Sequence, residues 1–191
     1  MKKILPCAGF LFLLTLASFA QHKIDFPEEF FQTLDRAQVE FIHPLDSDYR
    51  DIRPRQNDII ETDLAIYSRR EKLQIRYHIQ PEIDLQYTHA PPPHVRCIRL
   101  LLHLATNDQR FVMTGLDVDQ EKLREQFNAD WGKVFFFTPK DSFSSQENCK
   151  MLALYREGMG MAYVFFLFDD AGRELDNRFY ALRFQDEDLQ K

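Results

Sequence analysis

The feature that most constrains the fold is a run of seven apolar residues from Ala162 to Phe168. A strand with one face in water alternates apolar and polar side chains, whereas this run is apolar at every position. It therefore predicts a central strand that is covered on both sides. Residues 150–155 precede it across a short turn that contains Gly158 and Gly160, so the two segments are expected to form a hairpin.

A second hairpin is predicted over residues 60–79, because apolar and polar side chains alternate on either side of a four-residue loop, Ser68 to Glu71. Pairing Tyr67 with Lys72 places the apolar side chains of both strands on one buried face. The expected pairs on the other face are Ala65 with Gln74, Asp63 with Arg76, and Glu61 with His78. Charges of opposite sign face each other in this register, which supports it.

The remaining segments predict a mixture of short strands and helices. Amphipathic helices are expected after Pro27, over 95–105, after a cap at Asp117 or Asp119, and over 175–182. Strands are expected over 39–43 and 133–138, and residues 111–116 are either a strand or a linker. About six strands and four helices result, which fit an α+β fold with helices packed on one mostly antiparallel sheet.

This order of elements resembles the layout of the PsbP-like α/β/α sandwich superfamily, with Glu61 to His78 and Leu152 to Phe168 as the best segments. The resemblance covers most of the chain and rests on layout rather than on a motif. Members of that superfamily are mostly non-catalytic exported or lumenal proteins that bind or help to assemble larger complexes. The resemblance implies a similar binding or assembly role here.

The first twenty residues predict a cleavable secretory signal peptide. Lys2 and Lys3 form a basic start, Ile4 to Leu16 an apolar stretch too short to cross a bilayer, and Ser18 to Ala20 a small-x-small cleavage site. We expect residues 21–191 to form one α+β domain in the periplasm or outside the cell, with no membrane span left after cleavage.

The predicted mature chain is acidic and contains two cysteines. It holds 22 basic and 30 acidic residues, a formal charge of −8, which disfavours nucleic acids and anionic membrane surfaces as partners. Cys97 and Cys149 could form a disulfide in an oxidising compartment, or remain two buried thiols. Motifs for a serine nucleophile, a phosphate loop or a zinc protease are absent from the sequence, and no cofactor is expected.

A few side chains are candidates for ligand binding. Glu61, Asp63, Arg76 and His78 could act together as an acid/base or metal-binding patch, because a neighbouring carboxylate tunes an imidazole. Cross-strand pairing on a solvated sheet face accounts for the same four residues without any function. Trp131, the only tryptophan, could line a ligand groove or close the core at the boundary of two elements.

Three functions follow as hypotheses. The first is an exported non-enzymatic binding or assembly domain, whose partner would be another envelope or secreted protein. The second is a carrier for a small apolar ligand, suggested by the 18 phenylalanines. The third is a hydrolase or metal-dependent enzyme, which requires Glu61, Asp63 and His78 to converge in a cleft.

Overall fold

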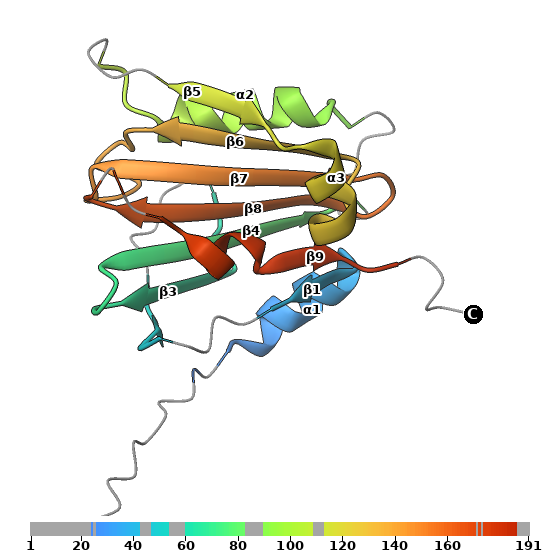
Figure 1. Cartoon of the computed structure of the whole chain (residues 1–191), viewed down its shortest axis with the longest axis horizontal. Helices are drawn as coiled ribbons and strands as arrows, with labels where there is room; N and C mark the ends of the chain where they lie inside the picture. Colours follow the sequence, from blue (N-terminus) through green and yellow to red (C-terminus); the bar gives the residue numbers. More distant parts are fainter. Residues whose placement is uncertain are drawn as a thin grey trace, which may run out of the picture.

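The computed structural model describes residues 24, 26–42, 47–53, 60–82, 90–108, 113–170, 172 and 174–186. The predicted signal peptide lies outside the described residues. A seven-stranded antiparallel sheet occupies the middle of the molecule, in the order β2-β3-β4-β8-β7-β6-β5, and β1 and β9 form a separate two-stranded ribbon (Figure 1). The strands are β1 (Val39–Phe41), β2 (Arg50–Asp51), β3 (Leu64–Ser68), β4 (Leu73–Pro81), β5 (Thr114–Asp117), β6 (Trp131–Phe137), β7 (Asn148–Arg156), β8 (Gly160–Phe168) and β9 (Leu182–Phe184).

Helices cover parts of both faces of this sheet. They are α1 (Glu28–Arg36), α2 (Pro93–Leu104), the short α3 (Gln120–Lys122) with a π-helical turn η2 (Leu123–Phe127), and a 3₁₀ turn η3 (Asp176–Tyr180). Asp119 caps α3 by accepting hydrogen bonds from the backbone N–H groups of Glu121 and Lys122. Among the described residues, no helix is long and apolar enough to cross a membrane. The predicted α+β class and antiparallel sheet are confirmed, although the numbers of strands and helices differ.

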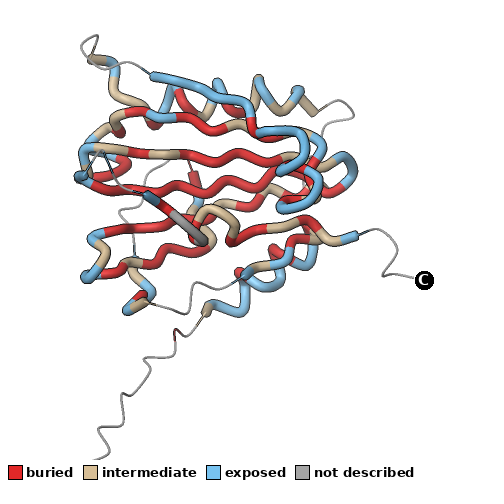
Figure 2. Tube along the Cα trace, in the orientation of Figure 1, coloured by how far each residue is buried: buried red, intermediate tan, exposed pale blue. Residues whose placement is uncertain are grey.

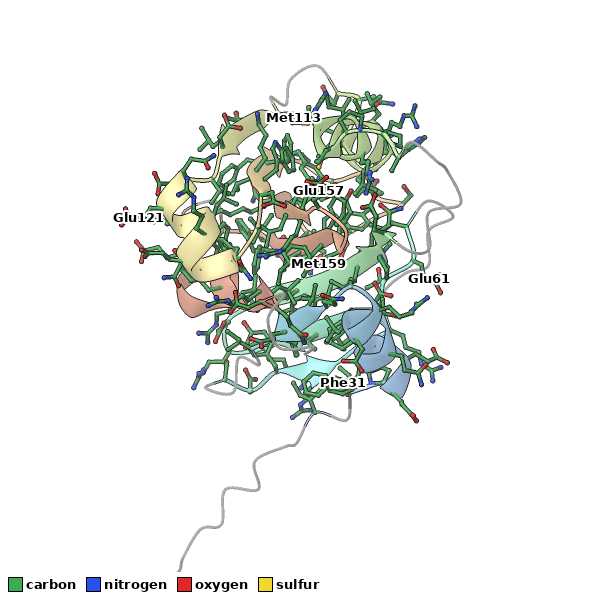
Figure 3. All side chains as sticks on the ribbon, turned by 90° about the vertical axis from the view of Figure 1, so that its right-hand side faces the viewer. Phe31, Glu61, Met113, Glu121, Glu157 and Met159 are labelled. Carbon is green, nitrogen blue, oxygen red and sulfur yellow. The ribbon has the colours of Figure 1, made fainter. Side chains whose placement is uncertain are left out.

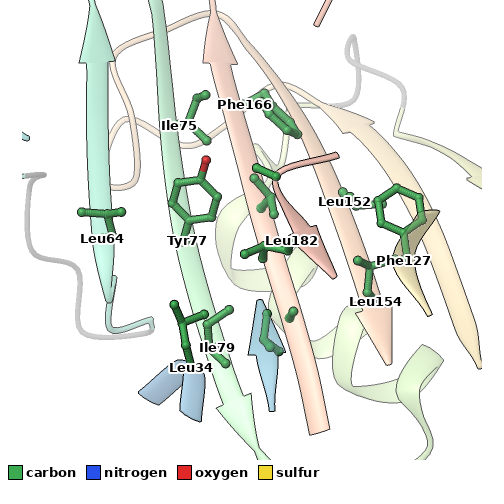
Figure 4. Close-up of a cluster of buried hydrophobic side chains, with 14 of the residues drawn as sticks. Leu34, Leu64, Ile75, Tyr77, Ile79, Phe127, Leu152, Leu154, Phe166 and Leu182 are labelled. Carbon is green, nitrogen blue, oxygen red and sulfur yellow. The ribbon is translucent and has the colours of Figure 1, made fainter. Parts of the chain in front are cut away.

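The prediction for β8 is confirmed, because all nine of its residues are buried. Figure 2 shows that burial is concentrated in the middle strands of the sheet. One apolar cluster lies on the side of α1, β1, β9 and η2, and it includes Leu34, Tyr77, Phe127 and Phe166 (Figure 4). A second cluster lies on the opposite side, where Leu101 of α2 and the 139–147 loop cover the sheet. The sheet is therefore the middle layer between two cores.

The hairpin of β3 and β4 forms as predicted, but its register differs by two residues. Ile66 pairs with Ile75, and Leu64 pairs with Tyr77. The turn begins one residue later than expected, because Ser68 belongs to the strand and Lys72 takes the left-handed conformation with φ of 50°. A shift of two keeps the side chains of the paired strands on their predicted faces, but Asp63 now lies beside His78, not Arg76. Ile60, expected on the same face as Ile66, precedes β3 and is instead buried in the cluster on the opposite side of the sheet.

The polar face of this hairpin is partly exposed at Glu61, Asp63 and His78 but buried further along, whereas the sequence-based expectation was a solvated face throughout. Gln74 and Arg76 are only 6% and 3% exposed. Phe143, from the loop after β6, packs under the guanidinium of Arg76 with 4.7 Å between the guanidinium carbon and the ring centre. A second layer therefore covers part of a face that alternation alone assigned to water.

The predicted closing helix over 175–182 is also wrong. The segment forms the short η3 and then β9, which pairs antiparallel with β1. Arg178 joins this segment to the turn between β3 and β4. It donates two hydrogen bonds to the carboxylate of Glu71, from Nη2 to Oε1 at 2.6 Å and from Nε to Oε2 at 3.2 Å. Alternating burial of Leu182, Arg183 and Phe184 fits a strand whose apolar residues face the core.

Candidate functional site

A polar cleft of about 760 Å³ lies between α1, residues 61–63 just before β3, and the last part of β4. Figure 3 views the molecule from the side, with Glu61 labelled near α1. The volume is in the range of sites that hold small organic molecules, about 300–1,000 Å³. The lining residues are Pro27, Glu29, Phe30, Gln32, Thr33, Arg36, Glu61, Thr62, Asp63, His78, Ile79 and Pro81.

One wall of the cleft is α1. The helix begins after Pro27, whose restricted φ suits a helix start. The negative charges of Glu28 and Glu29 in the first turn interact favourably with the positive end of the helix dipole. Phe30 and Thr33 are buried, while Glu29 and Arg36 are exposed at the rim. The Thr33 hydroxyl donates to the carbonyl of Glu29 at 3.0 Å and accepts from Nη2 of Arg36 at 3.4 Å. The rim of this wall therefore carries both charge signs above a largely apolar floor.

The opposite wall holds a carboxylate and an imidazole. Oδ2 of Asp63 lies 3.5 Å from Nδ1 of His78 and also accepts a hydrogen bond of 2.7 Å from the backbone N–H of Ile79. The Asp63 side chain is thus held at the end of β4, next to the ring. The His78 ring stacks on Tyr163, with 5.7 Å between ring centres and 17° between planes. Both the carboxylate and the imidazole are fixed by neighbours and remain partly exposed, at 16% and 21%.

The structure brings together three of the five predicted binding residues. Glu61, Asp63 and His78 line the same cleft. Arg76 points to the same side of the sheet as His78 but is buried further along β4 and lines a different cavity. Trp131 lies at the start of β6, where it pairs with Tyr155 and packs against the second core, as expected for a ring that closes the core.

Sequence reasoning missed the contribution of α1. Glu29 and Arg36 lie on the polar side of a helix that the sequence predicted, but nothing in the sequence indicates that this side faces the end of β4. With Glu61 and Asp63, the cleft contains three carboxylates against one arginine and one histidine. The described lining therefore holds more acidic than basic side chains.

The two cysteines are not part of this cleft. Both are buried as separate thiols in the second core. Burial raises the pKa of the Cys97 thiol to about 12 and that of Cys149 well above its usual value. Both thiols are therefore protonated at neutral pH and are poor nucleophiles.

The chemistry available in the cleft is binding and proton transfer. Its described lining residues include no serine or cysteine, and of the two threonines among them Thr33 already uses its hydroxyl within α1. In the part of the chain that the structure describes, no group of three His, Cys, Asp or Glu side chains could hold a metal ion. Comparison with models of known families, with curated proteins and with solved structures finds no match to this chain.

Proposed function

We propose that the protein is an exported, non-enzymatic binding domain and that the cleft between α1 and β4 binds a small organic cation. The observation that supports this is the convergence of Glu29, Glu61 and Asp63 around one cleft of about 760 Å³. A positively charged ligand with a short apolar part would place its charge among the carboxylates. Its apolar part would lie on the floor formed by Phe30 and Ile79.

The same lining argues against a carrier for an apolar ligand. Such a carrier needs a largely apolar cavity, but most of the described side chains around this cleft are polar or charged, and Phe30 is the only phenylalanine among them. An apolar molecule would have to remove water from several carboxylates without replacing their hydrogen bonds, which costs free energy. A charged ligand replaces those hydrogen bonds and gains from the charge attraction.

Binding of organic cations is the direct test. Calorimetric titration of the folded protein with putrescine, spermidine and tetramethylammonium should show saturable binding that weakens as salt rises, because exposed charges are screened. Replacing Glu29 and Glu61 together by glutamine should weaken the affinity by about fivefold or more, since each exposed charge pair contributes up to about 1 kcal/mol. Glu121→Gln is the matched control, because Glu121 is exposed on α3 and does not line the cleft. If none of the cations binds, or if the control loses as much affinity, the cleft is not the proposed site.

A hydrolase remains a second candidate because Asp63 lies beside His78 in the cleft. His78 could act as a general base on water, with Asp63 orienting its ring. Two observations weigh against this role: Oδ2 of Asp63 already accepts from the backbone N–H of Ile79, and the part of the lining that the structure describes offers no serine or cysteine nucleophile. Turnover of ester or amide substrates that is lost in both Asp63→Asn and His78→Gln, but kept in Glu121→Gln, would favour the enzyme over the binding domain.

The export part of the proposal is supported by the first twenty residues and has its own test. The full chain, expressed in a bacterium, should be recovered outside the cytoplasm with Gln21 as its first residue, measured by intact mass. Replacing Leu13 and Leu14 by arginine should retain the uncut chain in the cytoplasm. Recovery of the unmodified chain with Met1 still attached would contradict export by cleavage.

A further inference from the structure

A second cavity surrounds a buried arginine that has no acidic partner among the described residues. Arg76 is 3% exposed, and its charged group is held by neutral oxygens. Nη1 donates to the backbone carbonyl of Phe143 at 2.9 Å. When the amide of Gln74 is oriented so that its oxygen faces the guanidinium, that oxygen accepts from Nε at 2.8 Å and from Nη2 at 3.1 Å. These contacts use three of the five N–H groups of the guanidinium, and none of the accepting oxygens is charged.

The missing charge distinguishes Arg76 from the other buried arginines of the described segments. Arg178 pairs with Glu71 at 2.6 Å, and Arg96 pairs with Glu82 at 3.3 Å. No Asp or Glu of the described segments lies within ion-pair distance of Arg76. An ion removed from water is costly unless an opposite charge lies nearby.

Cys149 interacts electrostatically with Arg76 but does not balance its positive charge. It lies on β7, where burial raises the pKa of its thiol well above the usual value. A protonated thiol carries no charge at neutral pH. The counter-charge for Arg76 must therefore come from elsewhere.

A cavity of about 210 Å³ adjoins the guanidinium, and its lining is cationic and rich in hydrogen-bonding groups. Two arginines, Arg53 and Arg76, line it together with Ser144 and Ser145, and none of the described lining residues is an Asp or Glu. The Ser144 hydroxyl donates to Oε1 of Gln146, so Ser145 supplies the hydroxyl donor of the cavity. The remaining lining residues are Ile52, Gln74, Phe143 and Gln146. The space is smaller than a typical site for a drug-sized molecule, which begins at about 300 Å³.

We infer that this cavity is a binding site for a small oxyanion, such as a phosphate, sulfate or carboxylate group. Arginine presents a planar set of N–H donors that matches the oxygens of such groups, and hydroxyls complete their hydrogen bonds. The cavity shares no lining residue with the cleft between α1 and β4. The inference is therefore independent of the proposed function and goes beyond it.

The test measures anion binding by the folded protein at constant ionic strength. Phosphate, sulfate and acetate should each be exchanged for chloride while the melting temperature and the NMR signal of the Arg76 Nε–H group are followed. We expect a saturable rise in melting temperature and a saturable shift of that signal with at least one anion. Saturation matters, because sulfate and phosphate also stabilise proteins without binding to a site. A stronger response to phosphate and sulfate indicates a tetrahedral ligand, and a stronger response to acetate indicates a carboxylate.

Variants locate the response. Arg76→Met should abolish it, and Arg183→Gln, which removes a partly exposed arginine elsewhere, should retain it. Ser145→Asp would place a carboxylate at the cavity and should raise the melting temperature without added anion while removing the anion response, whereas the neutral Ser145→Asn should keep that response. The two Ser145 variants decide the matter if Arg76→Met does not fold. No saturable response to any of the three anions, or the same response in Ser145→Asp and Ser145→Asn, would overturn the inference.

Discussion

Removing the guanidinium of Arg178 should be among the most destabilising single changes in this protein. Arg178 and Glu71 are only 10% and 13% exposed, and they join η3 to the β3–β4 turn through two hydrogen bonds. The hydroxyl of Tyr49 donates to the same carboxylate at 2.6 Å. In Arg178→Met, the largely buried carboxylate of Glu71 would lose its closest cation and would keep a weak contact with Arg70, which lies 4.0 Å from Oε1 and is 65% exposed.

The size of the loss follows from that burial. Breaking a buried ion pair by removing one partner costs about 3–5 kcal/mol, most of it from the charge left behind. We expect about 3 kcal/mol for Arg178→Met, because Glu71 keeps its hydrogen bond from Tyr49. The double variant Glu71→Gln with Arg178→Met should lose less than the sum of the single variants, by about 1–3 kcal/mol, because no charge is then left unbalanced.

Urea unfolding of residues 21–191 measures these free energies, provided that the slope with urea is the same in every variant. Arg183→Met is the matched control, because Arg183 and Asp186 are 34% and 64% exposed and lie 3.8 Å apart. An exposed pair of this kind contributes about 0–1 kcal/mol. The reasoning fails if Arg178→Met loses no more stability than Arg183→Met, or if the losses in the double variant are simply additive.

Three further predictions concern the stability of the fold at low pH, the glycines of the turn between β7 and β8, and the reactivity of the two thiols. Burial opposes ionisation of Glu71, but hydrogen bonds led by that from Arg178 outweigh it and hold its pKa below the ordinary 4.5. Ionised Glu71 therefore stabilises the fold above that pH, and this contribution should be lost as the pH falls through the lowered pKa; urea unfolding at several pH values should show a flatter acid limb in Glu71→Gln. Gly160→Ala should cost about 3 kcal/mol or more in urea unfolding, because φ is +123° and the added Cβ would lie 2.2 Å from the Gln80 carbonyl oxygen. Gly158→Ala, with φ of +75° and open space around it, should cost only about 1–2 kcal/mol, and equal losses would refute the steric argument. Cys97 and Cys149 should react slowly with iodoacetamide in the folded protein and both react after unfolding without reductant; a single mass corresponding to no alkylation would instead indicate a disulfide.

Local sequence patterns predicted most of the helices and strands, whereas contacts between distant segments determined how these elements pair and which of their faces are buried. The continuous apolar run of β8 correctly indicated a strand covered on both sides. The β3–β4 hairpin was predicted with the correct faces, but alternation repeats every two residues and cannot distinguish registers that differ by two. The position of the turn decided between them, and it depends on the left-handed conformation of Lys72.

The candidate site was predictable only where its residues are close in sequence or paired across one hairpin. Asp63 and His78 meet because their strands are joined by a short turn. Glu29 and Arg36 could not be assigned to the site, because the packing of α1 on β4 is a contact between separate parts of the chain. Arg76 was assigned to a solvated face for the same reason, since the residue that covers it, Phe143, lies 67 positions away.

The pairing of β1 with β9 has a consequence for the order in which the molecule can be completed. Residues 39–41 pair with residues 182–184, so this ribbon closes a loop that contains nearly the whole described chain. A polypeptide that emerges with its N-terminus first can form the two long hairpins early, because their partners are close in sequence. It cannot form the ribbon until the last strand has appeared. Because α1 contacts both β1 and β4, the final shape of the cleft depends on residues near the opposite end of the chain, and truncation before Leu182 would leave α1 without part of its support.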